Sequence, residues 1–397
     1  MFGQRRLRRH LALHAPVAFL DSLARVIILY RMRILFKLTL AAGLLPLLAA
    51  GEQPLRLCIA GLVHGHVDGF LHAAAPRKDI QIAGIFDPDT ALQRHYAQLY
   101  GLADSVFFTD LGAMLDRVKP EAVATFTSTF DHATVVEACA RRHIHVMMEK
   151  PLAVNMEDAR AIARAAHAGG IHVIVNYETT WYRSHAAMWR LIKEQHSAGD
   201  IRKMVARDGH QGPKEIGVGP EFLAWLTDPV KNGAGALFDF GCYGANLMTW
   251  MMDNQRPVAV TAITQTIKPQ IYPRVDDEAS VLVEYPKAQG IIQASWNWPF
   301  NRKDFEVYGE RGYAVATGGD SLHVRLPGGQ EESRALEPLP PGERDSLSYL
   351  TAIVRGKLKP AGLSSLENNI VVTEILVAAR ESAQTGRTIK LAGAGGR

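Results

Sequence analysis

The sequence predicts an α/β protein in which a doubly wound parallel sheet is followed by an α/β domain with a large, mainly antiparallel open sheet. In residues 52–176, short apolar runs alternate with segments of helical length, a pattern typical of parallel sheets covered by helices. In residues 177–391, longer strand-like runs follow one another with turns between them, which favours antiparallel pairing. The sequence therefore divides into a leading segment (1–51), these two domains and a flexible tail (392–397).

The individual elements follow from the same patterns. Asn155, followed by two acids, is a typical helix start, and Gly169-Gly170 is a typical end. The first domain is predicted to have strands at 55–60, 80–86, 122–126, 144–148 and 171–176, with helices at 132–142 and 155–168 among others. The second is predicted to have helices at 184–196 and 366–383, a loop at 337–345, and strands at 258–267, 279–285, 290–297, 305–308 and 313–316.

Residues 1–51 have the layout of an export signal. From Met32 onward, two positive charges precede an apolar run and a small-residue end at Ala49-Ala50-Gly51. The apolar run is short for a membrane span, which takes about 20 residues. We therefore expect a periplasmic or exported protein with no stable membrane partner after signal removal. An uncleaved segment that anchors the chain in the membrane is the alternative.

Charge and cysteine content exclude two other classes of protein. Residues 1–51 hold eight Arg and Lys against one acid, so residues 52–397 carry a net charge of −3 within the total of +4. This balance gives no sign of nucleic-acid binding. The three cysteines form no C-x-x-C pair, which argues against a disulfide framework or a zinc ribbon and favours buried thiols.

The first predicted strand ends in a loop that departs from the usual phosphate-binding sequence. Against G-x-G-x-x-G, the stretch GLVHGH supplies Gly61 but has Val63 and His66 where the other glycines belong, with His64 and Gly65 between them. In one interpretation these five residues still bind a dinucleotide, with its pyrophosphate at the start of the next helix. In a second interpretation the loop is rebuilt and the cofactor is lost or moved.

A third interpretation makes His64 and His66 metal ligands. A zinc site needs at least one further protein ligand beside such a pair. Nothing in the sequence brings one near, so we predict no metal site; the histidines that qualify in principle are His72, His132 and His210.

Asp87 bears on the choice of nucleotide. It lies 26 residues after Gly61, at the end of the second predicted strand. An acid at this point of a Rossmann domain accepts hydrogen bonds from the adenosine ribose and repels a 2′-phosphate, so Asp87 favours NAD over NADP. Its position in "DPD" is also typical of a plain turn.

Two further stretches carry groups suited to proton transfer. In MMEKPLAV, Glu149 and Lys150 follow a buried strand at the carboxyl edge of the sheet, where ligands bind. In ALFDFGCYGAN, Asp239 and Tyr243 are four residues apart and share a face if this segment is one helix. A nearby ammonium favours the phenolate form of a tyrosine. Without such a partner, Asp239 is a helix cap and Tyr243 a packing residue.

The ordered series of these motifs resembles the Gfo/Idh/MocA (glucose–fructose oxidoreductase/inositol dehydrogenase) family. The resemblance covers residues 55–391 and rests on the glycine-loop strand, Asp87 and the following stretches, each at the expected spacing: TSTFDHATVVEACARRHIHVMMEKPLA (127–153), GHQGP (209–213), GAGALFDFGCYGAN (233–246), VDDEASVLVEYPKAQGIIQASW (275–296), VYGERGYAVATGGD (307–320) and ESAQTGRTIKL (381–391).

The resemblance implies an N-terminal Rossmann domain and a C-terminal domain whose open sheet makes a homo-oligomer. It places Thr127 and His132 at the nicotinamide cofactor, with Glu149 orienting Lys150, which contacts cofactor and substrate. Asp239 falls on the family's D-x-x-x-H pair, and Tyr243 replaces its histidine, as in a subset of the family. The full set implied to bind cofactor is Gly61, Val63, His64, Gly65, His66, Asp87, Thr127, His132, Glu149 and Lys150.

The resemblance also implies hydride transfer to or from a sugar, polyol or related carbohydrate. Removal of a hydride from a carbinol carbon requires removal of the hydroxyl proton, for which Tyr243 is the acid/base. Lys150 is expected to lower its pKa and stabilise the alkoxide, and Asp239 to hold Lys150 or the substrate. His210, in a polar Gly/Pro-rich loop, is a further substrate candidate.

An exported enzyme of this kind needs a tightly bound NAD that is regenerated in place, because free nicotinamide is scarce outside the cytoplasm. Two alternatives remain. One is an NAD-dependent glycosidase or lyase that uses transient keto-sugar chemistry. The other is a non-catalytic binding protein that kept the fold after losing its phosphate loop.

Overall fold

The computed structural model describes residues 53–391. The predicted export signal (1–51) and the predicted tail (392–397) lie outside the described residues. Among the described residues, every helix is too short or too polar to cross a membrane.

The first sheet has six parallel strands in the order β3-β2-β1-β4-β5-β6. The predicted doubly wound sheet is therefore confirmed. Its strands are β1 (Leu55–Ala60), β2 (Ile80–Phe86), β3 (Phe107–Phe108), β4 (Ala122–Thr125), β5 (His145–Glu149) and β6 (Val173–Asn176). The helices and short turns between them are α2 (His66–Ala74), α3 (Thr90–Tyr100), η1 (Asp104–Val106), α4 (Leu111–Val118), η2 (Thr129–Asp131), α5 (His132–Ala140) and α6 (Met156–Gly169).

Helix α6 illustrates how the local sequence sets these boundaries. The side chain of Asn155 accepts a hydrogen bond from the Asp158 N–H and so caps the first turn. At the other end, Gly170 adopts a left-handed conformation, with φ of 61°, and ends the helix. Both the predicted start and the predicted end are confirmed.

The register of the parallel strands brings the predicted site residues to one edge. Ala60 of β1 lies beside Thr125 of β4, which lies beside Met148 of β5. Glu149 in turn lies beside Asn176 of β6. The glycine loop, the segment after β4 and the Glu149-Lys150 pair therefore leave the sheet at the same carboxyl edge, where α/β proteins bind ligands.

The second sheet has nine strands in the order β14-β13-β12-β11-β7-β10-β9-β8-β15. Only the β7–β10 pair is parallel, so the sheet is mixed and mainly antiparallel, as predicted. Its strands are β7 (Ile201–Gly209), β8 (Ala259–Gln265), β9 (Glu278–Glu284), β10 (Gln289–Ser295), β11 (Arg302–Gly309), β12 (Tyr313–Thr317), β13 (Leu322–Arg325), β14 (Glu332–Ser333) and β15 (Ile389–Lys390).

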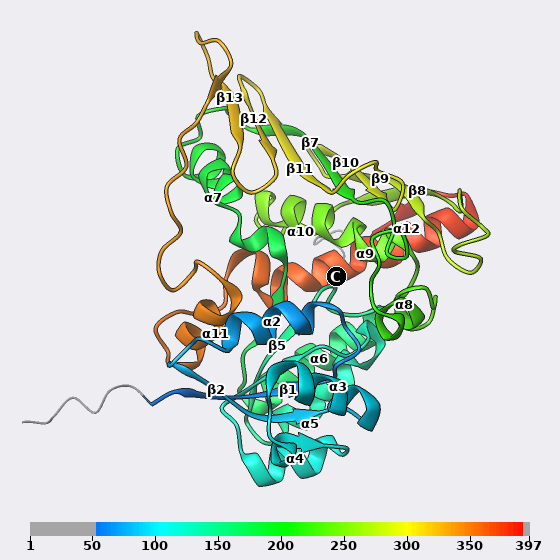
Figure 1. Ribbon diagram of the computed structural model, residues 1–397. Helices are drawn as coiled ribbons and strands as arrows, with labels where there is room; N and C mark the ends of the chain where they lie inside the picture. Colours follow the sequence, from blue (N-terminus) through cyan, green and yellow to red (C-terminus); the bar gives the residue numbers. More distant parts are fainter. Residues whose placement is uncertain (1–52, 392–397) are drawn as a thin grey trace, which may run out of the picture. The chain divides into compact units, whose positions relative to one another are not determined.

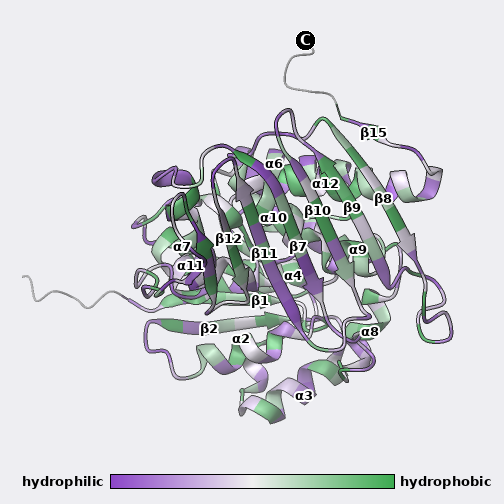
Figure 2. Cartoon of the chain, turned by 90° about the horizontal axis from the view of Figure 1, so that it is seen from above, coloured by the Kyte–Doolittle hydropathy of each residue, from purple (hydrophilic) through white to green (hydrophobic). Residues whose placement is uncertain are grey.

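Helices cover one face of this sheet. Helices α10 (Gly241–Met251) and α12 (Leu366–Thr385) pack against the strands, and α12 also contacts α6 and β6 of the first sheet (Figure 1). Figure 2 looks onto the other face, where no helix of the described chain covers the strands. The remaining elements are η3 (Glu178–Trp181), α7 (Arg183–Trp189), the π-helical turn η4 (Arg190–Glu194), α8 (Pro220–Leu226), α9 (Ala236–Asp239), α11 (Ser346–Val354) and η5 (Gly362–Ser364).

Helix α11 belongs to the core of the first sheet although it comes late in the chain. Its Leu347 and Leu350 are buried in the same cluster as Leu55 and Leu57 of β1. The sequence did not predict this helix, because the Pro- and Gly-rich stretch at 337–345 that precedes it indicates a loop or linker.

Candidate active site

Lys150 and Asp239 form a buried ion pair. Lys150 follows β5 and Asp239 ends α9, and the Lys150 Nζ donates to Asp239 Oδ1 at 2.6 Å and to its backbone oxygen at 3.0 Å. Burial disfavours both charges. The Asp239 carboxylate nevertheless raises the pKa of Lys150 above its usual value, and Lys150 lowers that of Asp239. The indole of Trp296 donates to the other carboxylate oxygen at 2.9 Å, so Asp239 is held from two sides.

Two ammonium groups lie over the ring of Tyr243. The Nζ atoms of Lys150 and Lys303 are 5.2 and 5.3 Å from the centre of its ring. Tyr177 meets the ring edge-on at 5.5 Å. These contacts place Tyr243 beside the Lys150–Asp239 pair, as the family resemblance implied.

The ionisation of Tyr243 differs from the expected one. Burial raises the pKa of its phenol well above the usual value, and Glu178 raises it further. Lys150 does not reverse this effect, because its ammonium is bound to Asp239 and lies over the ring. In this arrangement the phenol of Tyr243 keeps its proton at neutral pH, whereas the sequence analysis expected a lowered pKa.

Asp239 and Tyr243 do not lie on one continuous helix. Helix α9 ends at Asp239, and α10 begins at Gly241, after the break at Phe240. His210 joins the group from the loop after β7, with its ring edge-on to Phe240 at 4.8 Å. Its Nδ1 accepts the Gly212 N–H at 2.9 Å, while burial lowers its pKa and Asp239 opposes that shift.

The glycine loop needs glycine at its first position only. Gly61 has a φ of +90°, and a Cβ there would lie 2.7 Å from the backbone nitrogen of Thr127. At the second position, the Val63 carbonyl accepts the Trp225 indole N–H at 3.2 Å. Helix α8 thus packs on the loop, and its Phe222 is within 3.0 Å of the position of a Cβ on Gly65.

A cavity of about 490 Å³ adjoins this loop. Asp87 lies in its wall and accepts hydrogen bonds from the backbone N–H groups of Leu62 at 2.7 Å and Asp89 at 2.8 Å. Burial raises the pKa of Asp87, and these two hydrogen bonds partly offset that rise. The predicted cofactor residues in the lining are Gly61, Val63, Asp87 and Thr127, and the charged residues that join Asp87 there are Asp110, Asp131, Glu221 and Lys231.

His64, His66 and Glu149 meet on the other side of the loop. The His66 Nδ1 is 2.9 Å from Glu149 Oε2, and the His64 Nε2 is 4.0 Å from the same oxygen. Burial alone would raise the pKa of Glu149, but His66, His64 and Asn176 lower it to about 2. Glu149 therefore contacts the two histidines and makes no hydrogen bond to Lys150, which it was expected to orient.

His132 lies outside this group and outside the cavity wall. It is buried, and its Nδ1 is 3.2 Å from the carbonyl oxygen of Leu152. Its position supports the turn after Lys150, and the structure does not place it in the cavity with Thr127.

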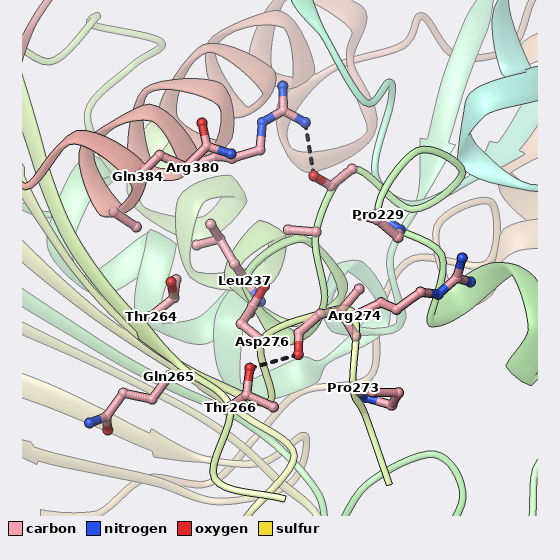
Figure 3. A pocket seen from close by; sticks show the side chains of 14 residues that line it. Pro229, Leu237, Thr264, Gln265, Thr266, Pro273, Arg274, Asp276, Arg380 and Gln384 are labelled. Carbon is pink, nitrogen blue, oxygen red and sulfur yellow. Dashed lines mark hydrogen bonds between the residues drawn. The ribbon is translucent and has the colours of Figure 1, made fainter. Parts of the chain in front are cut away.

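A second cavity, of about 340 Å³, lies beside the segment that leads into α9 (Figure 3). Arg380 of α12 donates to the Gly233 carbonyl at 2.8 Å, and its guanidinium stacks on the Phe238 ring at 5.1 Å. Asp276 accepts the N–H groups of Gly235 and Leu237. None of the predicted catalytic residues lines this cavity. Its wall does include Gly233, Ala234 and Leu237, which belong to the segment that leads to Asp239.

Four residues near Tyr243 and Glu149 were missed by the sequence analysis. Lys303 of β11 donates to Glu178 at 2.7 Å, and Asn176 donates to Glu149 Oε1 at 3.0 Å. Asp208 of β7 is fully buried, and neither of its carboxylate oxygens has a hydrogen-bond partner in the described chain. The available signal was the sequence "ARDGH": an acid beside the predicted His210, in a strand that the analysis did not assign.

The pH dependence of the free energy of unfolding should reveal that Asp208 is protonated in the folded protein. Burial raises its pKa well above the usual value, so the folded state keeps a proton that the unfolded chain loses above about pH 4. The contribution of Asp208 to the free energy of unfolding is therefore complete below that pH. It is lost as pH rises towards the folded pKa, and the free energy of unfolding falls by at most about 1.4 kcal/mol per pH unit. Urea unfolding at several pH values should find this slope reduced in Asp208→Asn.

The exposed Asp104 provides the control for that measurement. The Asp104→Asn variant should follow the wild-type pH dependence. A slope in Asp208→Asn equal to that of the wild type would show that Asp208 is ionised in the folded protein.

Two family models match the chain in the order of its two sheets. An oxidoreductase family with an NAD-binding Rossmann fold matches residues 56–177, and the GFO/IDH/MocA C-terminal domain matches residues 185–315. The chain belongs to the Gfo/Idh/MocA family. The resemblance inferred from the sequence motifs is thereby confirmed, as is the α/β architecture.

This Gfo/Idh/MocA protein is a distant relative of characterised members. It is 24% identical to trans-1,2-dihydrobenzene-1,2-diol dehydrogenase of Sus scrofa over 56% of its own length and 60% of that enzyme. It is 24% identical to 1,5-anhydro-D-fructose reductase of Ensifer adhaerens, over 70% and 84% of the two chains. The chain thus spans about three fifths of the first of these relatives.

Its fold is also that of a solved structure. Aldose-aldose oxidoreductase from Caulobacter crescentus, complexed with glycerol, superposes with a TM-score of 0.72 at 20% identity. The match covers 85% of this chain and 100% of that one.

Proposed function

We propose that this protein is an NAD-dependent oxidoreductase that transfers hydride between the cofactor and a carbon–oxygen group of a sugar, polyol or related carbohydrate. The observation that carries the proposal is the buried Lys150–Asp239 pair beside Tyr243, at the sheet edge that also bears the glycine loop. Such a set supplies a charge-stabilising group and a proton donor in a water-poor site. Relatives named as a diol dehydrogenase and an anhydro-D-fructose reductase support the substrate class.

The residues around the loop fit a dinucleotide. The 490 Å³ cavity lies at the carboxyl edge of the sheet, and Gly61 leaves room where any Cβ would collide with Thr127. Gly61, Val63, Asp87 and Thr127 would hold the cofactor, which supplies or takes up the hydride when bound. The acids of the cavity wall outnumber its single cation, Lys231, which favours NAD over a nucleotide with a 2′-phosphate.

The protein groups suit reduction of a carbonyl. As the carbonyl carbon gains the hydride, its oxygen takes negative charge, and Tyr243 donates the phenolic proton to it. Lys150 stabilises that oxygen, and Asp239 keeps Lys150 charged and in place. In the oxidative direction, Tyr243 in its phenolate form accepts the hydroxyl proton. His210, next to Asp239 and Phe240, is placed to contact a substrate hydroxyl.

Two broader features complete the proposal. The export layout of residues 1–51 supports a periplasmic enzyme whose NAD stays bound between turnovers. The uncovered face of the second sheet exposes Ile263 and Leu282, 68% and 44% exposed, which supports a homo-oligomer formed through this face.

The decisive experiment identifies the nucleotide that copurifies with the full chain. We expect denaturation to release close to one NAD(H) per chain, detected by absorbance and mass. If none is released and neither NAD nor NADP binds when added, the proposal is wrong and the loop has lost its dinucleotide. With a bound nucleotide, a product assay on glycosides then separates net oxidation or reduction from glycosidic-bond cleavage.

A further inference from the structure

We infer that His64, His66 and Glu149 form a binding site for a divalent transition metal of the zinc type. The inference rests on these side chains alone and does not depend on the proposed hydride transfer. The metal interpretation of the sequence lacked a third ligand. The fold supplies it from β5, which lies next but one to β1 in the sheet.

The donor set and spacing suit such a metal. Two imidazoles and one carboxylate are the three protein ligands of many open zinc sites. Zinc bonds of 2.0–2.1 Å at tetrahedral angles separate ligand atoms by about 3.3 Å. Here Glu149 Oε2 is 2.9 Å from His66 Nδ1 and 4.0 Å from His64 Nε2, so small side-chain rotations bring both nitrogens to that spacing.

One ligand atom also lacks any other partner. The His64 side chain is 1% exposed, and its Nε2 makes no hydrogen bond within residues 53–391. That nitrogen lies 4.0 Å from Glu149 Oε2, which is too far for a hydrogen bond. A metal ion between the two atoms would give the His64 nitrogen a partner.

The surroundings hold the ligands as they would in a metal site. Asn176 donates to Glu149 Oε1 at 3.0 Å and accepts the Trp181 indole N–H at 3.0 Å, which leaves Oε2 turned to the histidines. Phe222 and Trp225 pack on the His64 ring, at 4.6 and 5.4 Å between ring centres. Hydrogen bonds and apolar contacts of this kind orient the side chains that bind a metal ion and influence its affinity and reactivity.

The half-exposed His66 provides the entrance. Its side chain is 49% exposed, so the fourth coordination position faces solvent and takes water or an oxygen of a bound substrate. Binding has one cost. The His64 Nδ1 accepts the His66 N–H at 3.2 Å, so its proton must move from Nε2 to Nδ1 and displace that long hydrogen bond.

The test is a titration of the untagged full chain with Co²⁺ and Zn²⁺ after removal of metals by a chelator, without nucleotide or substrate. We expect one ion per chain by calorimetry, and visible Co²⁺ absorption typical of a four-coordinate site. His66→Ala and Glu149→Gln should abolish both signals. Asn176→Ala, which removes only an outer contact, should weaken binding about 10- to 100-fold.

His72→Ala provides the matched control, because His72 is an exposed histidine of the same helix α2. It should bind like the wild type. Absence of stoichiometric binding in the wild type, or equal loss in His72→Ala and His66→Ala with both variants folded by circular dichroism, would overturn the inference. Because no nucleotide is present, a failure to bind NAD leaves this result unaffected.

Discussion

Replacement of Lys150 by Met should lower kcat/KM for carbonyl reduction by about 10²- to 10³-fold. The methionine keeps the bulk of the aliphatic chain but removes the ammonium that lies 2.6 Å from Asp239 and 5.2 Å from the Tyr243 ring. Loss of one preorganised charge-stabilising donor from an active site typically has this effect. Steady-state kinetics with a saturating cofactor measures it.

The same substitution leaves the buried Asp239 without its counter-charge, which costs about 3–5 kcal/mol of stability. A folding defect must therefore be separated from a chemical one. The double variant Lys150→Met/Asp239→Asn removes both charges and should recover much of that stability but none of the activity. Wild-type activity in folded Lys150→Met would refute the assignment of Lys150.

Tyr243→Phe is expected to lower the reduction rate by about 10²- to 10⁴-fold, the usual contribution of a positioned acid/base. The phenylalanine ring preserves the contacts with Tyr177 and the two ammonium groups, so the fold should be unaffected. Hydroxyl removal at the buried Tyr285, which follows β9 and is not one of the proposed site residues, provides the control. Tyr285→Phe should keep wild-type kinetics.

The pH profile tests the role of Tyr243 more directly. Burial raises its pKa, so the proton donor should persist through neutral pH and be lost only above about pH 10, the ordinary range of tyrosine. The reduction rate should therefore stay level and then fall at alkaline pH, while the oxidation rate rises. An unchanged profile in Tyr243→Phe would assign the proton to another group.

Most of the first sheet could be predicted because five of its six strands carry their own local signal; the two-residue strand β3 (Phe107–Phe108) does not. The strands at 55–60 and 80–86 are apolar runs bounded by Gly and turn residues, and their bounds match the structure. Strand β7 was missed because its sequence, IRKMVARDG, contains two adjacent pairs of charged residues and no regular apolar alternation. Its place in the middle of the sheet depends on pairing with β10 and β11, which lie far away in sequence.

The site was predictable residue by residue but not in its contacts. Motif spacing identified Lys150, Asp239 and Tyr243, yet the break at Phe240 and the partner of Glu149 depend on packing. In the sequence, Val63 and His66 only replace glycines of the usual motif. In the structure, the Val63 carbonyl accepts a hydrogen bond from Trp225, and the His66 ring contacts Glu149. Local sequence does not encode such contacts, because the partners lie over 80 residues away.

The position of helix α11 near the end of the sequence affects how the chain folds during synthesis. Leu347 and Leu350 complete the cluster that buries Leu55 and Leu57, so part of the apolar surface of β1 stays uncovered until about 290 further residues have been synthesised. A fragment ending at residue 177 would expose that apolar surface and should aggregate. The earliest strands therefore stay partly uncovered during synthesis, and neither half is an independent unit for truncation or domain exchange.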